Sequence, residues 1–154
     1  MIATVLAVAA LGSAPDYLTT VTSPVFDAPG RTAAQLAATA NICMAQTLAS
    51  GQEGGQLIVS SDPATGVVVS NNRMEYRDGL LMWQVRSRLT FEGRDGRFRL
   101  VHNGIERFND QGGGWTGIGK WRGAGWQKAE AAYTAISERV ASCVLSQGEA
   151  GDDW

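Results

Sequence analysis

Two segments of the chain repeat apolar residues at the three- and four-residue spacing of an amphipathic helix. The first follows Arg31 and has apolar residues at positions 33, 36, 37, 40, 43, 44 and 48. The second begins at Trp126 and has apolar residues at positions 129, 133, 136, 140, 143 and 144. Because each segment carries a single apolar stripe, we expect both helices to pack on one surface of another layer.

Between these segments the chain alternates apolar and polar residues in the manner of β-strands. Residues 56–61 and 66–76 are rich in valine and isoleucine and flank the turn sequence Asp-Pro-Ala-Thr at 62–65, which predicts one hairpin. Residues 81–92 and 97–102 alternate around Asp-Gly at 95–96 and predict a second hairpin.

The Asp95-Gly96 turn also sets the register of the second hairpin. A two-residue turn places Arg94 opposite Arg97. Counting outward then pairs Phe91 with Leu100, Leu89 with His102, and Glu92 with Arg99. One face of this hairpin is therefore expected to be core and the other to be charged.

The order of these elements predicts an α+β fold. A first strand at 17–26 precedes the first helix, and two hairpins and the second helix follow, which gives the order β-α-β-β-β-β-α. We expect an antiparallel sheet of about five strands with both helices packed on one face and the opposite face open. Residues 25–147 form a single domain in this scheme, and 148–154 form an acidic tail.

The beginning of the sequence has the features of a secretory signal peptide. Residues 2–11 form an unbroken run of apolar and small residues that is too short to span a bilayer. Ala10 and Gly12 fit the −3 and −1 positions of a cleavage site, so we expect a signal peptide at 1–12 and a linker leading into the first strand at 13–24. No lysine or arginine precedes the apolar run, and a buried first strand or helix is the alternative. The mature chain is expected to be soluble, periplasmic or secreted, without a transmembrane segment.

The two cysteines, Cys43 and Cys143, agree with export. An even number of cysteines in an oxidising compartment suggests one disulfide. Two buried thiols are the alternative, because separation along the chain does not show whether the Cα atoms come within bonding range.

Three stretches of the sequence resemble a known family. They are FDAPGRTAAQL at 26–36, DPATGVVV at 62–69 and FEGRDGRFRLVHNGI at 91–105. They look like the bacterial envelope domain of unknown function 4468, and the resemblance covers about residues 25–144. It implies a TATA-binding-protein-like fold and an envelope setting. It brings no catalytic residues or established activity, and the name of the fold does not by itself imply DNA binding.

Composition narrows the classes of function. The net charge is −2, which argues against a protein whose whole surface attracts nucleic acid or acidic lipid, so any basic site must be local. His102 is the only histidine, and we expect no metal and no cofactor. Residues 114–120 match G-x-x-x-x-G-K, but Trp121 stands where a serine or threonine must coordinate magnesium. We therefore expect this stretch to be a flexible surface connection.

Arginines on the charged face of the second hairpin are the first candidate binding site. Arg86, Arg88, Arg97 and Arg99 share this face by the register above, and Arg73, Arg77 and Arg107 extend it. Such a face can hold an anionic polymer or an acidic partner through bidentate contacts. Glu75, Glu92 and Glu106 lie among the arginines, so cross-strand charge pairs on a solvated face are the alternative.

Tryptophans in and after the glycine-rich connection at 109–125 are the second candidate. Trp115 and Trp121 offer flat faces that can stack on a sugar ring or on a side chain of a partner. The alternative is that Trp121 and Trp126 fold back over the sheet edge and the second helix.

The sequence does not identify a biochemical activity. Our hypothesis is a non-enzymatic binding or interaction domain of the bacterial envelope, with an unknown envelope protein or an anionic or glycan ligand as partner and no nucleic acid. One alternative is a small hydrolase-like enzyme with a site near His102, for which Cys43 is a conceivable nucleophile. Another is a self-associating structural subunit.

Overall fold

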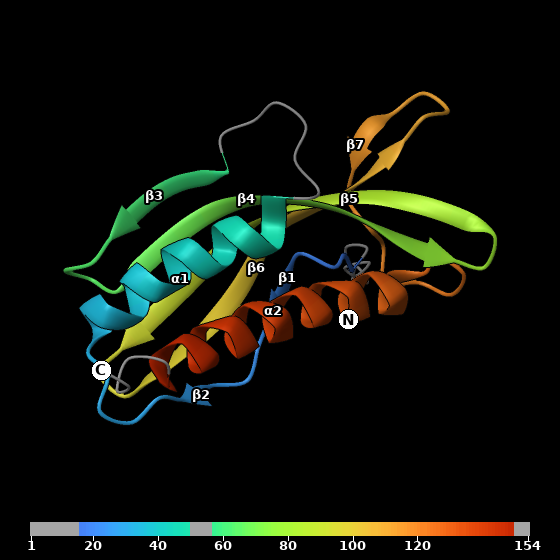
Figure 1. Cartoon of the computed structure of the whole chain (residues 1–154). Coiled ribbons are helices and arrows are strands. Elements are labelled where there is room, and N and C mark those ends of the chain that lie inside the picture. The colour runs from blue at the N-terminus through green and yellow to red at the C-terminus, as the bar shows by residue number, and fades with distance from the viewer. Residues whose placement is uncertain (1–15, 50–56, 150–154) are drawn as a thin grey trace, which may run out of the picture.

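A computed structural model of the chain describes residues 16–49 and 57–149 (Figure 1). These residues form an antiparallel sheet with two helices on one of its faces, so the predicted α+β fold is confirmed. The predicted signal peptide at 1–12, the first part of the linker and the end of the acidic tail lie outside the described residues.

The two helices are the two amphipathic segments. Helix α1 spans Ala33–Leu48 and helix α2 spans Trp126–Glu149, so α2 includes the first two residues of the expected tail. Thr32 and Gln35 form a capping box at the start of α1, because each side chain accepts a hydrogen bond from the backbone N–H of the other. Within 16–49 and 57–149, no helix is long and apolar enough to cross a membrane.

The sheet has seven strands rather than the five expected. They are β1 Thr20–Thr22, β2 Phe26–Asp27, β3 Ile58–Asp62, β4 Val67–Asp78, β5 Leu81–Arg94, β6 Arg97–Asn109 and β7 Gly114–Thr116. Their order is β1-β6-β5-β4-β3, and β2 and β7 also pair with β6.

Local chemistry explains the two additional strands. The predicted first strand is divided into β1 and β2 around Pro24, which has no N–H to donate to a neighbouring strand. Strand β7 arises in the glycine-rich connection, which we expected to be irregular. This connection is instead anchored at two further points, since Tyr17 and Gly119 form a β-bridge and Ile118 is fully buried.

The register of the β5–β6 hairpin follows from its turn as predicted. The four expected pairs, Arg94 with Arg97, Glu92 with Arg99, Phe91 with Leu100 and Leu89 with His102, are all present. Farther from the turn the register shifts, because Arg88 pairs with Asn103 whereas Arg86 pairs with Glu106. The extra residue on β6 is accommodated at Gly104, whose φ of +62° is readily adopted only by glycine.

The core between sheet and helices is divided into two apolar clusters. One joins α1 and the later turns of α2 to the middle strands through residues such as Met44 and Phe91. The other joins the first turns of α2 to the opposite end of the sheet through residues such as Ile118 and Tyr133. Five buried polar residues lie along the strands and helix between the two clusters: Ser70, Asn72, Ser87, His102 and Ser137.

A disulfide links the two helices across the core. Cys43 of α1 and Cys143 of α2 are bonded, with their Cα atoms 5.8 Å apart. This structure therefore contains the bridge and not the two buried thiols that were the alternative. The bond closes a loop whose ends are 100 residues apart in the sequence.

Candidate functional site

The predicted arginines lie on the face of the sheet opposite the helices. Along β5, Leu89 points into the core, whereas Arg86 and Arg88 are exposed on the other side. Arg97 and Arg99 of β6 are exposed in the same way. We call this surface, made by the outward residues of β4, β5 and β6, the outer face.

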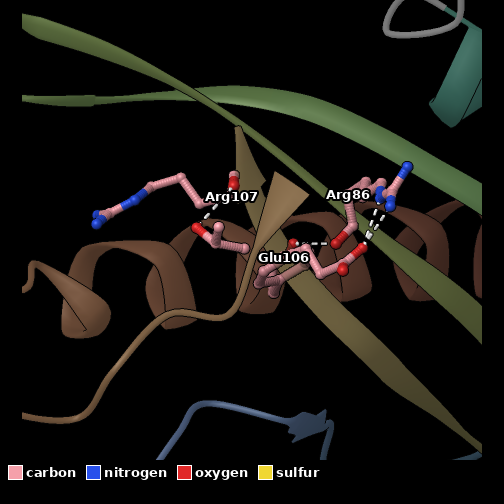
Figure 2. A network of polar contacts seen from close by, with 5 residues as sticks. Arg86, Glu106 and Arg107 are labelled. Atoms are coloured by element: carbon pink, nitrogen blue, oxygen red, sulfur yellow. Dashed lines mark hydrogen bonds and ion pairs between the residues drawn. The ribbon is translucent and has the colours of Figure 1, made fainter. Parts of the chain in front are cut away.

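The expected extension of the arginine patch is correct for β4 and wrong for β6. Arg73 and Arg77 are outward residues of β4. Arg107 instead points to the helix side, where its Cζ lies 4.2 Å from the centroid of the Trp83 ring, and its side chain points away from Arg86 and Glu106 (Figure 2). The reason is the bulge at Gly104, which turns the later residues of β6 to the face opposite to that given by a regular alternation.

Trp115 of β7 joins these arginines. Strand β7 pairs with the end of β6, and the hairpin that they form rises from the sheet on the side away from the helices (Figure 1). The Cζ atoms of Arg86 and Arg73 lie 4.5 Å and 5.3 Å from the centroid of the Trp115 ring. Phe108 packs against the same ring with a centroid distance of 5.4 Å. The arginine face and part of the aromatic connection, two separate candidates in the sequence, thus form one site.

Arg86 is fixed from both sides of the sheet. Its Nε and Nη2 atoms both lie 2.6 Å from Oε2 of Glu106 on the adjacent strand (Figure 2). Its backbone carbonyl accepts a hydrogen bond of 2.9 Å from the hydroxyl of Tyr133 in α2. Burial raises the pKa of Tyr133 above its usual range, so the hydroxyl remains a donor. The guanidinium is nonetheless accessible, because the Arg86 side chain is 46% exposed.

A second arginine cluster lies on the outer face near the β5–β6 turn. Arg99 donates to Glu92 across the strands at 2.6 Å. A hollow of about 220 Å³ adjoins this pair and is lined by Val25, Glu92, Arg94, Arg97, Phe98 and Arg99. Arg94 was not among the predicted site residues, although it occupies the same alternate positions of β5 as Arg86 and Arg88.

The outer face combines paired and unpaired guanidiniums. The two ion pairs agree with the alternative of cross-strand charge pairs for Arg86 and Arg99. Among residues 16–49 and 57–149, no carboxylate pairs with Arg88, Arg94 or Arg97. The face therefore presents three guanidiniums that are available for an anionic ligand.

Trp121 does not join Trp115. Its ring packs edge-on against Tyr17 at a centroid distance of 5.7 Å and lies directly over Gly119, where a Cβ atom would come within 1.8 Å of it. Trp126 is half-buried against the second apolar cluster, and Lys120 Nζ lies 5.6 Å from its ring centroid. These two tryptophans thus fold back onto the chain, as the alternative expected.

Residues 114–120 do not have the strand-loop-helix context of a phosphate-binding loop. They begin in β7 and continue to the bridge at Gly119, and α2 begins only at Trp126. In the part of the chain that the structure describes, no three His, Cys, Asp or Glu side chains are grouped so that they could hold a metal ion.

His102 belongs to a buried chain of polar side chains. Its Nδ1 lies 3.0 Å from Oγ of Ser87 and its Nε2 lies 3.1 Å from Oγ of Ser137, while Asn72 donates to Ser87 at 3.3 Å. Burial lowers the pKa of His102 to about 3, because the charged imidazolium loses its hydration there. The ring is therefore neutral near pH 7 and is satisfied by two hydroxyls.

This arrangement does not provide the expected Cys/His pair. Cys43 is bonded to Cys143 and has no thiol, so the idea of Cys43 as a nucleophile is wrong. Ser87 and Ser137 lie within hydrogen-bonding distance of the imidazole, but they and His102 are all buried under α2. A general base must reach the proton that it abstracts from a bound substrate, and this imidazole has no exposed surface.

Comparisons with known proteins identify the fold. A DUF4468 family protein from Bacteroides ovatus ATCC 8483 matches with a TM-score of 0.59 and 16% identity, over 81% of this chain and 85% of that chain. A TBP-like protein from Parabacteroides distasonis ATCC 8503 matches with a TM-score of 0.63 and 7% identity, over 81% of this chain and 91% of that chain. No protein-family model matches the sequence, and no curated protein matches it. At these identities the likeness concerns the fold alone, and the TBP-like fold implied by the sequence resemblance is the fold that this chain shares with both proteins.

Proposed function

We propose that the chain is a non-enzymatic binding domain of the bacterial envelope and that its outer face binds an anionic glycan chain. The observation that carries the proposal is the cluster of Arg73, Arg86 and Trp115, with Arg88 at the next outward position of β5. This cluster places cationic and aromatic groups side by side on an exposed surface.

The charges support an anionic ligand. A guanidinium donates in a planar fork that fits a carboxylate or phosphate, and Arg88, Arg94 and Arg97 have no carboxylate partner among the described residues. Arg86 and Arg73 are already oriented by Glu106 and Gln84, so less conformational entropy is lost when a ligand binds to them.

The aromatic groups favour a glycan among anionic ligands. Trp115 and Phe108 supply flat apolar surface beside the guanidiniums, and such surface packs well on the C–H groups of a sugar ring. Contacts with two guanidiniums keep the indole in place.

The spacing of the arginines favours a linear polymer over a small anion. Outward positions of β5 carry Arg86, Arg88 and Arg94, and a strand rises about 3.4 Å per residue, so these guanidiniums are distributed over roughly 27 Å. Glu92 interrupts the row, but Arg99 neutralises it. A chain of repeating acidic sugars can contact several of these groups at once.

The envelope setting rests on three observations. The sequence begins with the features of a signal peptide, and the chain contains a disulfide, a bond that persists in oxidising compartments. Both similar solved structures come from bacteria.

The alternatives receive less support. A hydrolase-like site near His102 would require access to an imidazole that is fully buried. Self-association has no specific observation in its favour among the described residues.

A titration of fluorescently labelled polygalacturonate with the chain tests the proposal. We expect saturable binding that weakens as salt is added, and little binding to neutral dextran. Arg88→Gln removes an unpaired guanidinium, and we expect the affinity to fall about tenfold, as a charged hydrogen bond contributes about 1.5 to 3 kcal/mol. Arg139→Gln is the matched control, because Arg139 is an exposed arginine of α2, on the helix side. Absence of saturable binding, or equal losses in the two variants, would refute the proposal.

A further inference from the structure

The turn between β4 and β5 ends in an exposed apolar tip. Leu80, Leu81 and Met82 are 101%, 59% and 53% exposed. This hairpin reaches the right-hand end of the molecule, beside the start of α2 (Figure 1). Single exposed apolar residues are common, but three in succession at a hairpin turn serve neither the core nor the outer face.

The apolar side chains of this tip point in different directions. Leu81 is paired with Asp78 and Met82 with Arg77 across the hairpin, and successive residues of a strand point to opposite faces. Met82 therefore projects on the side of the outer face, Leu81 on the helix side, and Leu80 from the turn itself. A groove on a protein covers one side of a strand, whereas a fluid bilayer can surround such a tip from every side.

Two half-buried tryptophans lie behind the tip, each with a cation on its ring. Arg107 Cζ lies 4.2 Å from the centroid of Trp83, and Lys120 Nζ lies 5.6 Å from that of Trp126. Tryptophan is enriched at membrane interfaces, because its ring is apolar and its N–H is polar. The sequence of apolar tip, indole and cation matches the change in polarity from acyl chains to headgroups.

The tip is held firmly against the start of α2. Asp78 pairs with Lys128 at 2.8 Å, and a Cβ atom at Gly125 would lie 2.7 Å from Asp78 Oδ2. The charged residues of this end are the cations Arg77, Arg107, Lys120, Arg122 and Lys128, and the carboxylates Asp16, Asp78 and Glu130. The local balance is positive although the chain as a whole is negative, and it complements anionic headgroups.

We propose that this tip docks the chain on an anionic lipid bilayer. Leu80, Leu81 and Met82 enter the boundary between headgroups and acyl chains, and the cations behind them contact lipid phosphates. The docking surface lies at the end of the β4–β5 hairpin and does not include Arg88 or Trp115. The proposal is therefore independent of glycan binding by the outer face.

Sedimentation with lipid vesicles tests the proposal. We expect the full chain to bind vesicles of phosphatidylcholine with phosphatidylglycerol more strongly than vesicles of phosphatidylcholine alone. Leu80→Gln/Met82→Gln is expected to lower the partition coefficient at least about tenfold, because burial of these side chains is lost. Ile42→Gln, which changes a residue of α1 that is 49% exposed, is the control and is expected to bind like the original chain.

A label at the tip provides a second readout. The two cysteines of the chain are bonded to each other, so Leu80→Cys introduces a single thiol for a polarity-sensitive dye. Its emission is expected to shift to the blue when anionic vesicles are added, whereas the same dye on Ile42→Cys is expected to remain in water.

The proposal is overturned if the chain does not bind anionic vesicles, if Leu80→Gln/Met82→Gln binds them equally well, or if the dye at position 80 remains in water. Arg88→Gln separates the two proposals, because it is expected to weaken polygalacturonate binding and to leave vesicle binding unchanged. Loss of vesicle binding in Arg88→Gln would assign the lipid contact to the outer face and contradict docking by the tip.

Discussion

The guanidinium of Arg86 lies over the ring of Trp115, with 4.5 Å between Cζ and the ring centroid. The two residues come from different parts of the chain, and the β6–β7 hairpin brings them together on the outer face. Glu106 holds the other edge of the same guanidinium. The cluster thus has a fixed geometry in the absence of a ligand, and the variants below test its role separately from the stability of the fold.

Replacement of Glu106 is expected to strengthen binding of an anionic glycan. Glu106→Gln removes a negative charge from the cluster and releases Arg86 from its ion pair. We expect a several-fold higher affinity for polygalacturonate and a change in stability within about 1 kcal/mol, since the pair is solvent-exposed. Glu138→Gln on α2 is the control, and a lower affinity in Glu106→Gln would contradict the assigned role of the cluster.

Removal of the disulfide is expected to destabilise the fold. The bond between Cys43 and Cys143 closes a loop with a sequence separation of 100, for which the chain-entropy model gives about 4 to 5 kcal/mol. Urea unfolding with and without a reductant measures the effect. The variant Cys43→Ala/Cys143→Ala is expected to unfold at the lower midpoint under both conditions. An unchanged midpoint on reduction would show that the bridge contributes little.

His102 is expected to make the stability depend on pH. Its pKa is about 3 in the folded chain, while a histidine in the unfolded chain titrates near 6.5. Between these values the unfolded chain binds a proton that the folded chain does not, so stability falls as the pH is lowered from about 6.5 toward 3, by up to about 1.4 kcal/mol per unit.

Urea unfolding of the original chain and of His102→Gln, at about pH 7 and about pH 4.5, isolates this contribution. Carboxylates titrate in both proteins, so only the difference between the two slopes reports on the imidazole. We expect His102→Gln to be less stable at neutral pH and to lose less stability on acidification. Parallel losses would contradict a neutral, buried imidazole.

Two glycines with positive φ are expected to differ in their tolerance of alanine. At Gly79, φ is +62° and a Cβ atom would meet nothing within 4 Å, so Gly79→Ala is expected to cost about 1 to 2 kcal/mol from the backbone alone. At Gly66, φ is +73° and a Cβ atom would lie 2.3 Å from the carbonyl oxygen of Gly93. Gly66→Ala is expected to cost about 1 to 3 kcal/mol more. Equal losses in thermal unfolding would mean that the backbone near Gly66 relaxes freely.

Local patterns were sufficient to predict the helices, the two hairpins and the register near Asp95-Gly96. The turn fixes this register because a two-residue loop allows one pairing. The bulge at Gly104 could not be predicted in the same way, since a glycine within a strand indicates a bulge, a bend or a close backbone approach equally well. The misplacement of Arg107 follows directly from this ambiguity.

The candidate site was predictable only in part. Alternation along β5 and β6 is a local property, and it placed Arg86, Arg88, Arg97 and Arg99 on one face correctly. The contact of Trp115 with Arg86 depends on how the β6–β7 hairpin leaves the sheet, which no local pattern reveals. The partners of His102 are likewise nonlocal, because serines at core positions of a strand and a helix do not show which polar group they will meet.

Chemical-shift mapping by NMR tests the central claim most directly. Titration of the ¹⁵N-labelled chain with polygalacturonate should shift the Trp115 indole N–H and the Arg86 and Arg88 resonances in a saturable manner. The indole N–H of Trp121 and the amides of α2 should be unaffected. Shifts confined to Trp121 or α2, or no saturable shifts, would contradict the proposal that the outer face binds an anionic glycan.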